Sequence, residues 1–208
     1  MIIDADGVEA DVTHAVSRIT AIVAECGGQT VEATDEKQRA RIWSGRKAAF
    51  AAMGKLAPDM ICMDGTIPRH ALPFVLDEMT KLSEKYELGF CNVFHAGDGN
   101  LHPLIIFDIM KPGEFERAEA FGADILRLCV KVGGVLSGEH GVGVEKRDLM
   151  PAMFGETDLE QQQRLKCAFD TGALFNPGKV FPTLSACVEQ GHIHVHGAQL
   201  PHPHLPRF

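Results

Sequence analysis

The stretch that decides the fold covers residues 89–108 and reads GFCNVFHAGDGNLHPLIIFD. Two apolar runs, residues 89–95 and 101–108, flank the glycine-rich sequence AGDGN, which has the turn chemistry of a β-hairpin. His95 closes the first run and His102 opens the second. The segment therefore predicts a hairpin whose short loop brings two imidazoles to one place.

Helical periodicity surrounds this hairpin on both sides. In the first such segment, Val12, Val16, Ile19 and Val23 recur at spacings of four and three, which predicts an amphipathic helix. Thr34 is a plausible N-cap for the second helix. By the same patterns and by glycine and proline positions, we expect helices at residues 9–26, 34–54, 68–86, 112–132 and 158–170.

Three further short segments have the composition of strands, at residues 2–5, 29–33 and 59–64. Together with the hairpin they give the order β-α-β-α-β-α-β-β-α, which combines parallel crossovers with one tight hairpin. This order predicts an α+β fold in which a mixed or antiparallel sheet carries helices packed mainly on one face.

Composition narrows the class of protein. The 208 residues include 20 Lys and Arg against 28 Asp and Glu, so the net charge is 20 − 28 = −8. Because phosphate binding needs a basic face, this balance argues against nucleic acid as a partner. The sequence contains no signal-peptide pattern and no apolar run long enough for a transmembrane helix, and a cytoplasmic location is expected.

Two segments carry residues suited to metal binding. Neutral imidazole is the commonest nitrogen ligand, so His95 and His102 form a first candidate pair, the alternative being two hydrogen-bonded histidines near a turn. The second segment, SGEHGVG at residues 137–143, offers Glu139 and His140 between glycines. Neighbouring residues of an extended segment point to opposite sides, so Glu139 is expected to face a metal and His140 to face away. The alternative is an exposed Glu-His pair beside a flexible loop.

His95, His102 and Glu139 together would form a ligand set with an open position, the kind used by catalytic metal sites. Arg46 is a candidate clamp for a carboxylate, with a solvated surface arginine as the alternative. Asn176 lies in FNPGKVFP, residues 175–182, where the alternative is a plain turn after a helix. The chain lacks the GxGxxG, GxxxxGK[ST] and GxSxG motifs of nicotinamide, nucleotide-triphosphate and serine-hydrolase sites.

The segments FHAGDGNLHP (residues 94–103), SGEHGVGVEK (137–146) and FNPGKVFP (175–182), read in order, resemble the C-terminal part of FAD-linked 2-hydroxy-acid oxidases and dehydrogenases. The likeness is strongest to the flavin subunit of the glycolate oxidases and extends over nearly the whole chain. It implies a ferredoxin-like cap domain of the FAD-linked oxidase C-terminal type.

The resemblance also implies roles for single residues. His95, His102 and Glu139 would match the ligands of a divalent metal, with Zn²⁺ as a candidate, that holds the substrate and lowers its hydroxyl pKa. His140 would match the base that removes the hydroxyl proton while hydride leaves for the flavin. Arg46 would match an arginine that binds the substrate carboxylate, and Asn176 would lie in the segment that returns to the flavin.

The implied organisation has three parts. Residues 1–143 would form a substrate-binding cap with the metal site, residues 144–182 a helical return segment that packs on an FAD-binding domain, and residues 183–208 a tail rich in His and Pro. No pyrophosphate-binding loop is present, so FAD would be bound mainly by an N-terminal domain missing from this chain, which begins as if inside a strand.

The resemblance implies that this chain is one part of an oxidoreductase. It would be the substrate- and metal-binding portion of a flavoprotein that oxidises a small 2-hydroxy acid to a 2-oxo acid, and it would be inactive without an FAD-binding half. The alternatives are a stand-alone module that binds metal and hydroxy acids without turnover, and a non-functional fragment. Further flavin-domain and iron–sulfur subunits are implied partners, and peripheral attachment to the inner membrane through such partners is the alternative to a purely cytoplasmic location.

Overall fold

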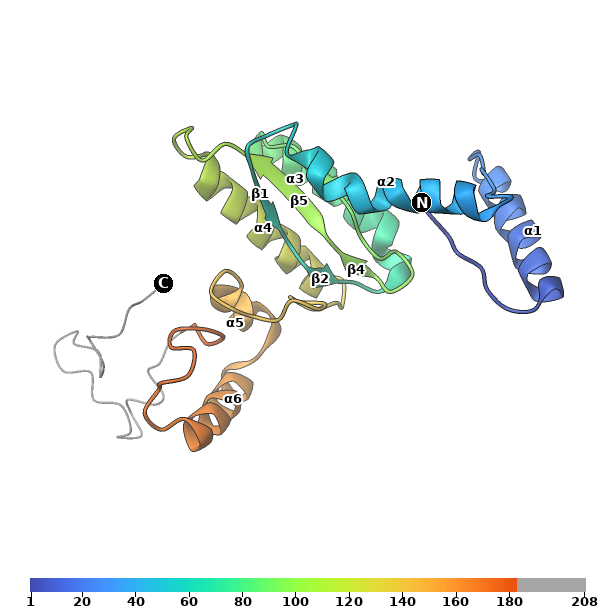
Figure 1. Ribbon diagram of the computed structural model, residues 1–208. Coiled ribbons are helices and arrows are strands. Elements are labelled where there is room, and N and C mark those ends of the chain that lie inside the picture. The colour runs from blue at the N-terminus through green and yellow to red at the C-terminus, as the bar shows by residue number, and fades with distance from the viewer. Residues whose placement is uncertain (183–208) are drawn as a thin grey trace. The chain divides into compact units, whose positions relative to one another are not determined.

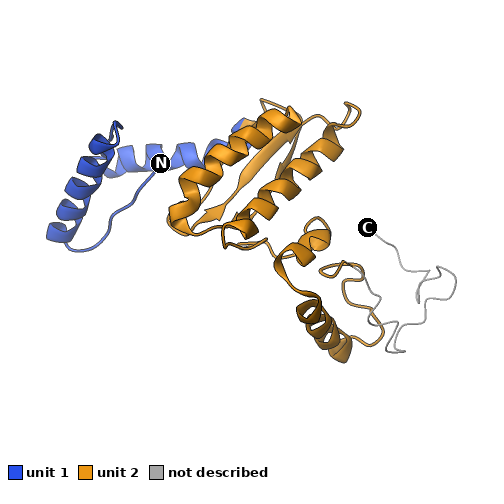
Figure 2. Ribbon diagram, turned by 180° about the vertical axis from the view of Figure 1, so that it is seen from behind, with its two compact units in different colours: residues 1–52 blue, residues 53–208 orange. Residues whose placement is uncertain are grey.

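The computed structural model describes residues 1–182 (Figure 1). The predicted tail at residues 183–208 falls outside these described residues, together with its histidines His192, His194, His196, His202 and His204. The chain divides into two compact units, residues 1–52 and the residues from Met53 onward (Figure 2).

The first unit is built from two helices, α1 (Glu9–Glu25) and α2 (Glu36–Met53). Both were expected from the sequence, and their bounds agree to within two residues. The cap of α2 differs from the prediction: the helix begins after Asp35, whose Oδ1 accepts a hydrogen bond of 2.7 Å from the backbone N–H of Gln38. Asp35, rather than Thr34, therefore supplies the capping oxygen.

The two strands expected in this unit do not form. Residues 1–6 and 28–34 have no regular secondary structure, and their apolar side chains stay in contact with solvent, Met1 at 93% and Val31 at 86% exposure. A strand needs a partner for its backbone groups, and no strand lies within residues 1–52 to provide one. Short apolar runs were thus mistaken for strands.

The second unit contains a three-stranded antiparallel sheet in the order β1-β5-β3, from β1 (Asp59–Cys62), β5 (Pro103–Phe107) and β3 (Phe90–Asn92). A second, two-stranded sheet pairs β2 (Gly65–Thr66) with β4 (Asn100–Leu101). Every strand pair within the described residues is antiparallel, so the expected parallel crossovers do not occur there. The predicted α+β class is confirmed.

Two helices cover one face of the three-stranded sheet, α3 (Leu72–Tyr86), entered through the short helix η1 (Arg69–Ala71), and α4 (Glu114–Lys131). Figure 2 shows them side by side in front of the strands, and α4 contacts both β5 and β1. Burial of their apolar faces against the sheet forms the core. Its fully buried members include Val75, Met79, Phe121, Ile125, Leu101 and Ile105.

The predicted hairpin is confirmed at residues 89–108, where the backbone N–H of His95 donates to the carbonyl of Asn100 at 3.0 Å. Gly99 permits its turn, because it has φ +74° and a Cβ there would lie 2.2 Å from the Ile67 carbonyl oxygen. The tight loop fixes the spacing between His95 and His102.

After α4 the chain runs through residues 133–146 to η2 (Arg147–Leu149), α5 (Met150–Met153) and α6 (Glu156–Phe169). The turn expected at Asn-Pro-Gly forms, and this segment is tied back to the preceding loop because the N–H of Val180 donates to the Gly143 carbonyl at 3.0 Å.

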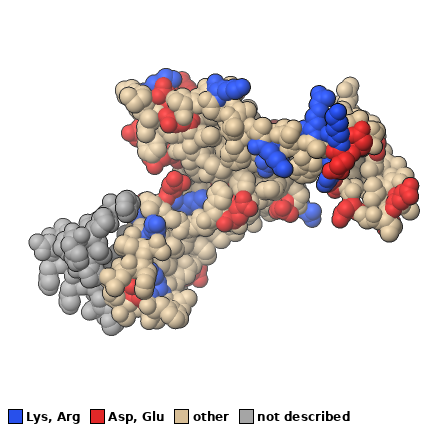
Figure 3. All heavy atoms as spheres, viewed as in Figure 1, with Lys and Arg blue, Asp and Glu red and all other residues tan. Residues whose placement is uncertain are grey.

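Two surface properties bear on earlier expectations. Acidic and basic side chains lie interspersed on the face shown in Figure 3. Within residues 1–182 we find no helix with both the length and the apolar character needed to cross a lipid bilayer.

Candidate metal centre

Strand register brings four chain segments together at one place. Gly65 pairs with Leu101 and Thr66 with Asn100, so the preceding Asp64 comes opposite His102. On the other side of β2, Thr66 pairs with Val135, which brings residues 137–140 alongside Asp64. On the far side of His102, the N–H of Val93 donates to the His102 carbonyl at 3.2 Å. Residues that lie far apart in sequence therefore converge around His102.

The three side chains expected to bind metal do come together. The rings of His95 and His102 are edge to face with centroids 5.5 Å apart, and Nε2 of His102 lies 3.0 Å from Oε1 of Glu139. Ligand atoms of His95, His102 and Glu139 all lie within 4.8 Å of one another. His102 is nearly buried while His95 and Glu139 are exposed, so the group opens toward solvent.

His140 joins the same cluster, contrary to the expectation that it faces away from Glu139. Its ring stacks on that of His102 with centroids 5.3 Å apart, and its Nε2 lies 3.8 Å from Oε1 of Glu139. The prediction assumed an extended strand, but residues 138–140 form consecutive bends, which turn neighbouring side chains to the same side.

The bends have a visible cause, the carboxylate of Asp64, which is completely buried. It accepts hydrogen bonds from three successive backbone N–H groups, those of Gly138 at 3.1 Å, Glu139 at 3.1 Å and His140 at 2.9 Å. The hydroxyl of Ser137 donates to Oδ2 at 2.8 Å. The loop is thus wrapped around a buried anion.

Lys146 completes this arrangement. Its ammonium group donates to Oδ2 of Asp64 at 3.1 Å, to the backbone carbonyl of Asp64 at 3.0 Å and to Oγ of Ser137 at 3.1 Å. Its side chain is 7% exposed, so all three donors of the ammonium group are used inside the protein.

Gly138 allows the loop to approach this closely. A Cβ at this position would lie 2.4 Å from Oδ1 of Asn100 and 2.8 Å from Oδ1 of Asp64, closer than real side-chain contacts permit. Oδ1 of Asn100 is buried without a hydrogen-bond partner, while its Nδ2 lies 3.5 Å from Nε2 of His102. A glycine is therefore required where the loop crosses Asn100.

Burial and hydrogen bonding set the charges of the cluster. Burial alone would raise the pKa of Asp64, but the N–H of His140, the Ser137 hydroxyl and the Lys146 ammonium outweigh it and hold that pKa well below its ordinary value. Burial lowers the pKa of His102, against the opposing effect of the nearby carboxylates. An ionised Asp64 and a neutral His102 are favoured, and neutral imidazole is the form that binds metals.

The cluster separates into two regions, named here for use below. The floor consists of Asp64, Asn100, Ser137 and Lys146, and the rim of His95, Glu139 and His140, with His102 between them. Asp64, His102 and His140 also lie close enough to share an ion. Since the Asp64 oxygens already accept from five groups, the set formed by His102 and the two rim residues His95 and Glu139 fits a cation better.

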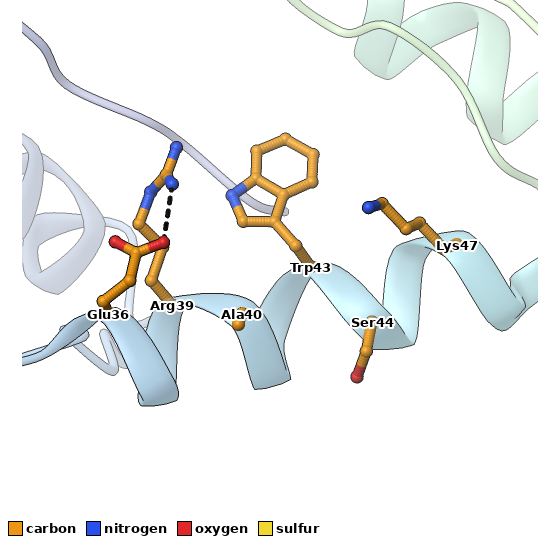
Figure 4. A pocket seen from close by; sticks show the side chains of 6 residues that line it. All are labelled: Glu36, Arg39, Ala40, Trp43, Ser44 and Lys47. Atoms are coloured by element: carbon orange, nitrogen blue, oxygen red, sulfur yellow. Dashed lines mark hydrogen bonds and ion pairs between the residues drawn. The ribbon is translucent and has the colours of Figure 1, made fainter.

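The other two predicted site residues lie elsewhere in the sequence. Arg46 is on α2 in the first unit, and a pocket on the same helix does not include it among its lining residues (Figure 4). That pocket is lined by Glu36, Arg39, Ala40, Trp43, Ser44 and Lys47. Asn176 lies in the second unit, at the turn after α6, with φ +47°. Their predicted roles remain predictions.

Sequence reasoning missed the floor. Asp64 was counted only as the end of an apolar segment, and Lys146 only as the last residue of a motif. An isolated carboxylate between an apolar strand and a glycine was the one available signal, since its partners are 73 to 82 positions away.

Comparison with protein families matches residues 1–180 to FAD linked oxidases, C-terminal domain. Among curated proteins, the glycolate oxidase subunit GlcD of Escherichia coli strain K12 is 52% identical over the whole of this chain, and that match covers 42% of the subunit. The glycolate oxidase subunit GlcD of Bacillus subtilis strain 168 is 32% identical over 87% of this chain and 39% of its own length.

A more distant relative is the probable mitochondrial D-lactate dehydrogenase of Danio rerio, which is 32% identical over 79% of this chain and 33% of its own length. The chain thus spans less than half the length of each of these relatives.

Proposed function

This chain belongs to the FAD linked oxidases through their C-terminal domain, and from that premise we propose that it forms the substrate- and metal-binding part of a glycolate oxidase-type flavoprotein. The reaction would be oxidation of a small 2-hydroxy acid to a 2-oxo acid by hydride transfer to FAD. The observation that carries the proposal is the cluster of His95, His102 and Glu139, whose ligand atoms lie within 4.8 Å of one another beside His140.

The chemistry of this donor set suits a divalent cation. Two imidazoles and one carboxylate form a set that leaves a coordination position open for a substrate, and Zn²⁺ is the first candidate for such ligands. When bound, the cation would make the substrate hydroxyl more acidic, and FAD would accept the hydride. His102 would form the inner ligand, while Glu139, with a side chain 53% exposed, faces incoming substrate.

His140 is the proposed proton acceptor. Its side chain is 47% exposed, so a substrate can reach the ring, and its stacking on His102 keeps it next to the proposed ligands. Geometry within hydrogen-bond reach of the hydroxyl is the first requirement for a general base. His140 would take the hydroxyl proton and hold it during hydride departure.

The proposal extends to the remaining predicted residues. Arg46 would bind the substrate carboxylate through its guanidinium, and Asn176 would lie near the flavin. We retain the division into a cap at residues 1–143, a return segment at 144–182 and a tail at 183–208. FAD would be held mainly by a partner domain or chain, with further flavin-domain and iron–sulfur subunits as partners, in the cytoplasm or peripheral to the inner membrane through those partners.

Metal content and ligand binding test this function directly. The purified chain should contain about one equivalent of a divalent metal by elemental analysis, and calorimetry should detect binding of glycolate or D-lactate only to the metal-loaded form. His102→Ala should abolish both. A wild-type chain without affinity for any divalent metal, or equal metal content in His102→Ala, would contradict the proposal.

Flavin content tests the proposed dependence on an FAD-binding half. The isolated chain should lack the visible absorption of flavin and should not oxidise glycolate. A yellow preparation that turns over glycolate by itself would show that the proposed division of labour is wrong.

A further inference from the structure

We propose that the buried pair Asp64–Lys146 is a positioning device that sets the metal-facing geometry of Glu139 and His140. The inference rests on the proposed metal site and deepens it by adding two residues that touch neither the substrate nor, in the case of Lys146, the metal. Lys146 is the informative member, because an ammonium group cannot be a metal ligand.

The loop acquires its shape from hydrogen bonds to the Asp64 carboxylate. Residues 138–140, which lie outside any helix or strand, direct three consecutive N–H groups at one carboxylate. Because all three N–H groups converge on Asp64, the directions of the Glu139 and His140 side chains are fixed relative to its carboxylate. Moving the carboxylate would therefore move Glu139 and His140 together.

Lys146 holds the Asp64 carboxylate in place. The Lys146 ammonium donates hydrogen bonds to the backbone carbonyl and the side chain of Asp64, and also to the hydroxyl of Ser137 at the start of the loop. One buried cation thus links Asp64, which precedes strand β2, to Ser137 in the loop. Without Lys146, the hydrogen bonds to the Asp64 carboxylate would come from the loop that it is meant to position, with only the more distant His102 ring beside it at 3.6 Å.

The rim residues Glu139 and His140 have little freedom to move. Glu139 reaches His102 with a separation of 3.0 Å between Oε1 and Nε2, and His140 stacks on the same ring with an angle of 8° between the ring planes. Gly138 already lies in close contact with Asn100. Slight rotation of the loop would separate Glu139 from His102, so exact placement of the loop determines whether the ligand set can close on an ion.

A merely structural ion pair is the competing explanation. Buried salt bridges are weak evidence for stability, because burying two charges costs about as much as their attraction returns. The location of this pair favours a positioning role instead, since every contact of the Lys146 ammonium leads to Asp64 or to Ser137, both next to the proposed ligands. Groups that orient metal ligands typically change metal affinity by about 10- to 100-fold when removed.

Co²⁺ binding to the full chain tests the inference, with the visible absorption of Co²⁺ reporting coordination geometry. Lys146→Met should raise the Co²⁺ dissociation constant about 10- to 100-fold and change the spectrum of the bound ion. Ser137→Ala should have a smaller effect in the same direction, and Ser137→Thr, which keeps the hydroxyl, should restore wild-type binding. Lys85→Met is the matched control, because it removes the lysine of the Lys85–Asp124 ion pair elsewhere in the second unit.

Thermal unfolding of every variant separates the two explanations. A purely structural pair predicts a lowered melting temperature with Co²⁺ affinity and spectrum unchanged in the folded protein, and that result would overturn the inference. If Lys146→Met fails to fold, the contrast between Ser137→Ala and Ser137→Thr decides: equal affinities overturn the inference, and a loss restored by threonine supports it. Absence of Co²⁺ binding to the wild type would overturn the proposed metal site together with this inference, whereas normal wild-type binding with unchanged variants overturns the inference alone.

Discussion

The floor and the rim of the cluster contain similar chemical groups in opposite environments. The floor carboxylate, Asp64, is completely buried and accepts hydrogen bonds from backbone, hydroxyl and ammonium donors, whereas the rim carboxylate, Glu139, is 53% exposed and lies beside the imidazoles of His102 and His140. Burial has turned one acid into a fixed part of the fold and left the other available to a ligand. The difference separates residues expected to hold the loop in place, and so to act on binding from a distance, from those expected to contact a ligand directly.

The largest effect should come from removing the floor carboxylate. Asp64→Ala leaves the Lys146 ammonium buried without its anion, and breaking a buried pair in this way costs about 3–5 kcal/mol in the free energy of unfolding. Urea denaturation followed by circular dichroism measures the loss. Glu139→Ala is the control from the rim, and its stability should stay within about 0.5 kcal/mol of wild type, as is usual for an exposed substitution. Equal losses for the two variants would break the distinction between floor and rim.

The next largest effect belongs to the rim and should appear in binding alone. Glu139→Gln preserves size but replaces an anionic ligand with a neutral amide, so the Co²⁺ dissociation constant should rise by about 100-fold, or about 2.7 kcal/mol. Equilibrium dialysis gives the constant and the urea midpoint gives stability, which should not change. Glu145→Gln, also in the loop but outside the proposed ligand set, serves as the control. A dissociation constant that moves less than about threefold would remove Glu139 from the ligand set.

Acid should act on the floor through the depressed pKa of Asp64. The unfolded carboxyl has the ordinary value of 3.8 and the folded one lies well below it, so its contribution to stability is fully present above pH 3.8 and is lost as pH falls toward the folded pKa. In that window the wild type should lose about 1.4 kcal/mol per pH unit from this group. Asp64→Asn lacks the titrating carboxyl, so its free energy of unfolding should fall with pH less steeply than that of the wild type, by the same amount per pH unit. Parallel profiles for the two proteins would contradict the low pKa.

The sequence predicted those elements whose formation depends on residues close to one another in the chain. The hairpin at residues 89–108 follows from its own turn chemistry and α1 from its apolar periodicity, while α2 was expected at nearly the right bounds although Asp35, not Thr34, caps it. The strands expected at residues 2–5 and 29–33 failed because pairing needs a partner that a local pattern does not reveal.

The same limit explains the candidate site. His95, His102 and Glu139 could be named from their motifs, whereas the opposite orientation expected for Glu139 and His140 was wrong because a carboxylate 75 positions earlier shapes their loop. Side-chain direction there depends on Asp64, and only the strand register reveals that Asp64 lies opposite His102.

The variant with the smallest expected effect tests where the boundary between floor and rim lies. His140 could serve a cation with Asp64 and His102, or it could act only on a proton beside the set formed by His95, His102 and Glu139. Because the Asp64 oxygens are already occupied by protein donors, we expect the second arrangement. His140→Gln should then leave Co²⁺ affinity within about threefold of wild type and stability within about 0.5 kcal/mol, while His95→Ala weakens Co²⁺ binding strongly. The reverse pattern, strong loss in His140→Gln and none in His95→Ala, would place the cation on the floor, and Asp64 would then have to release donors of the loop to bind it.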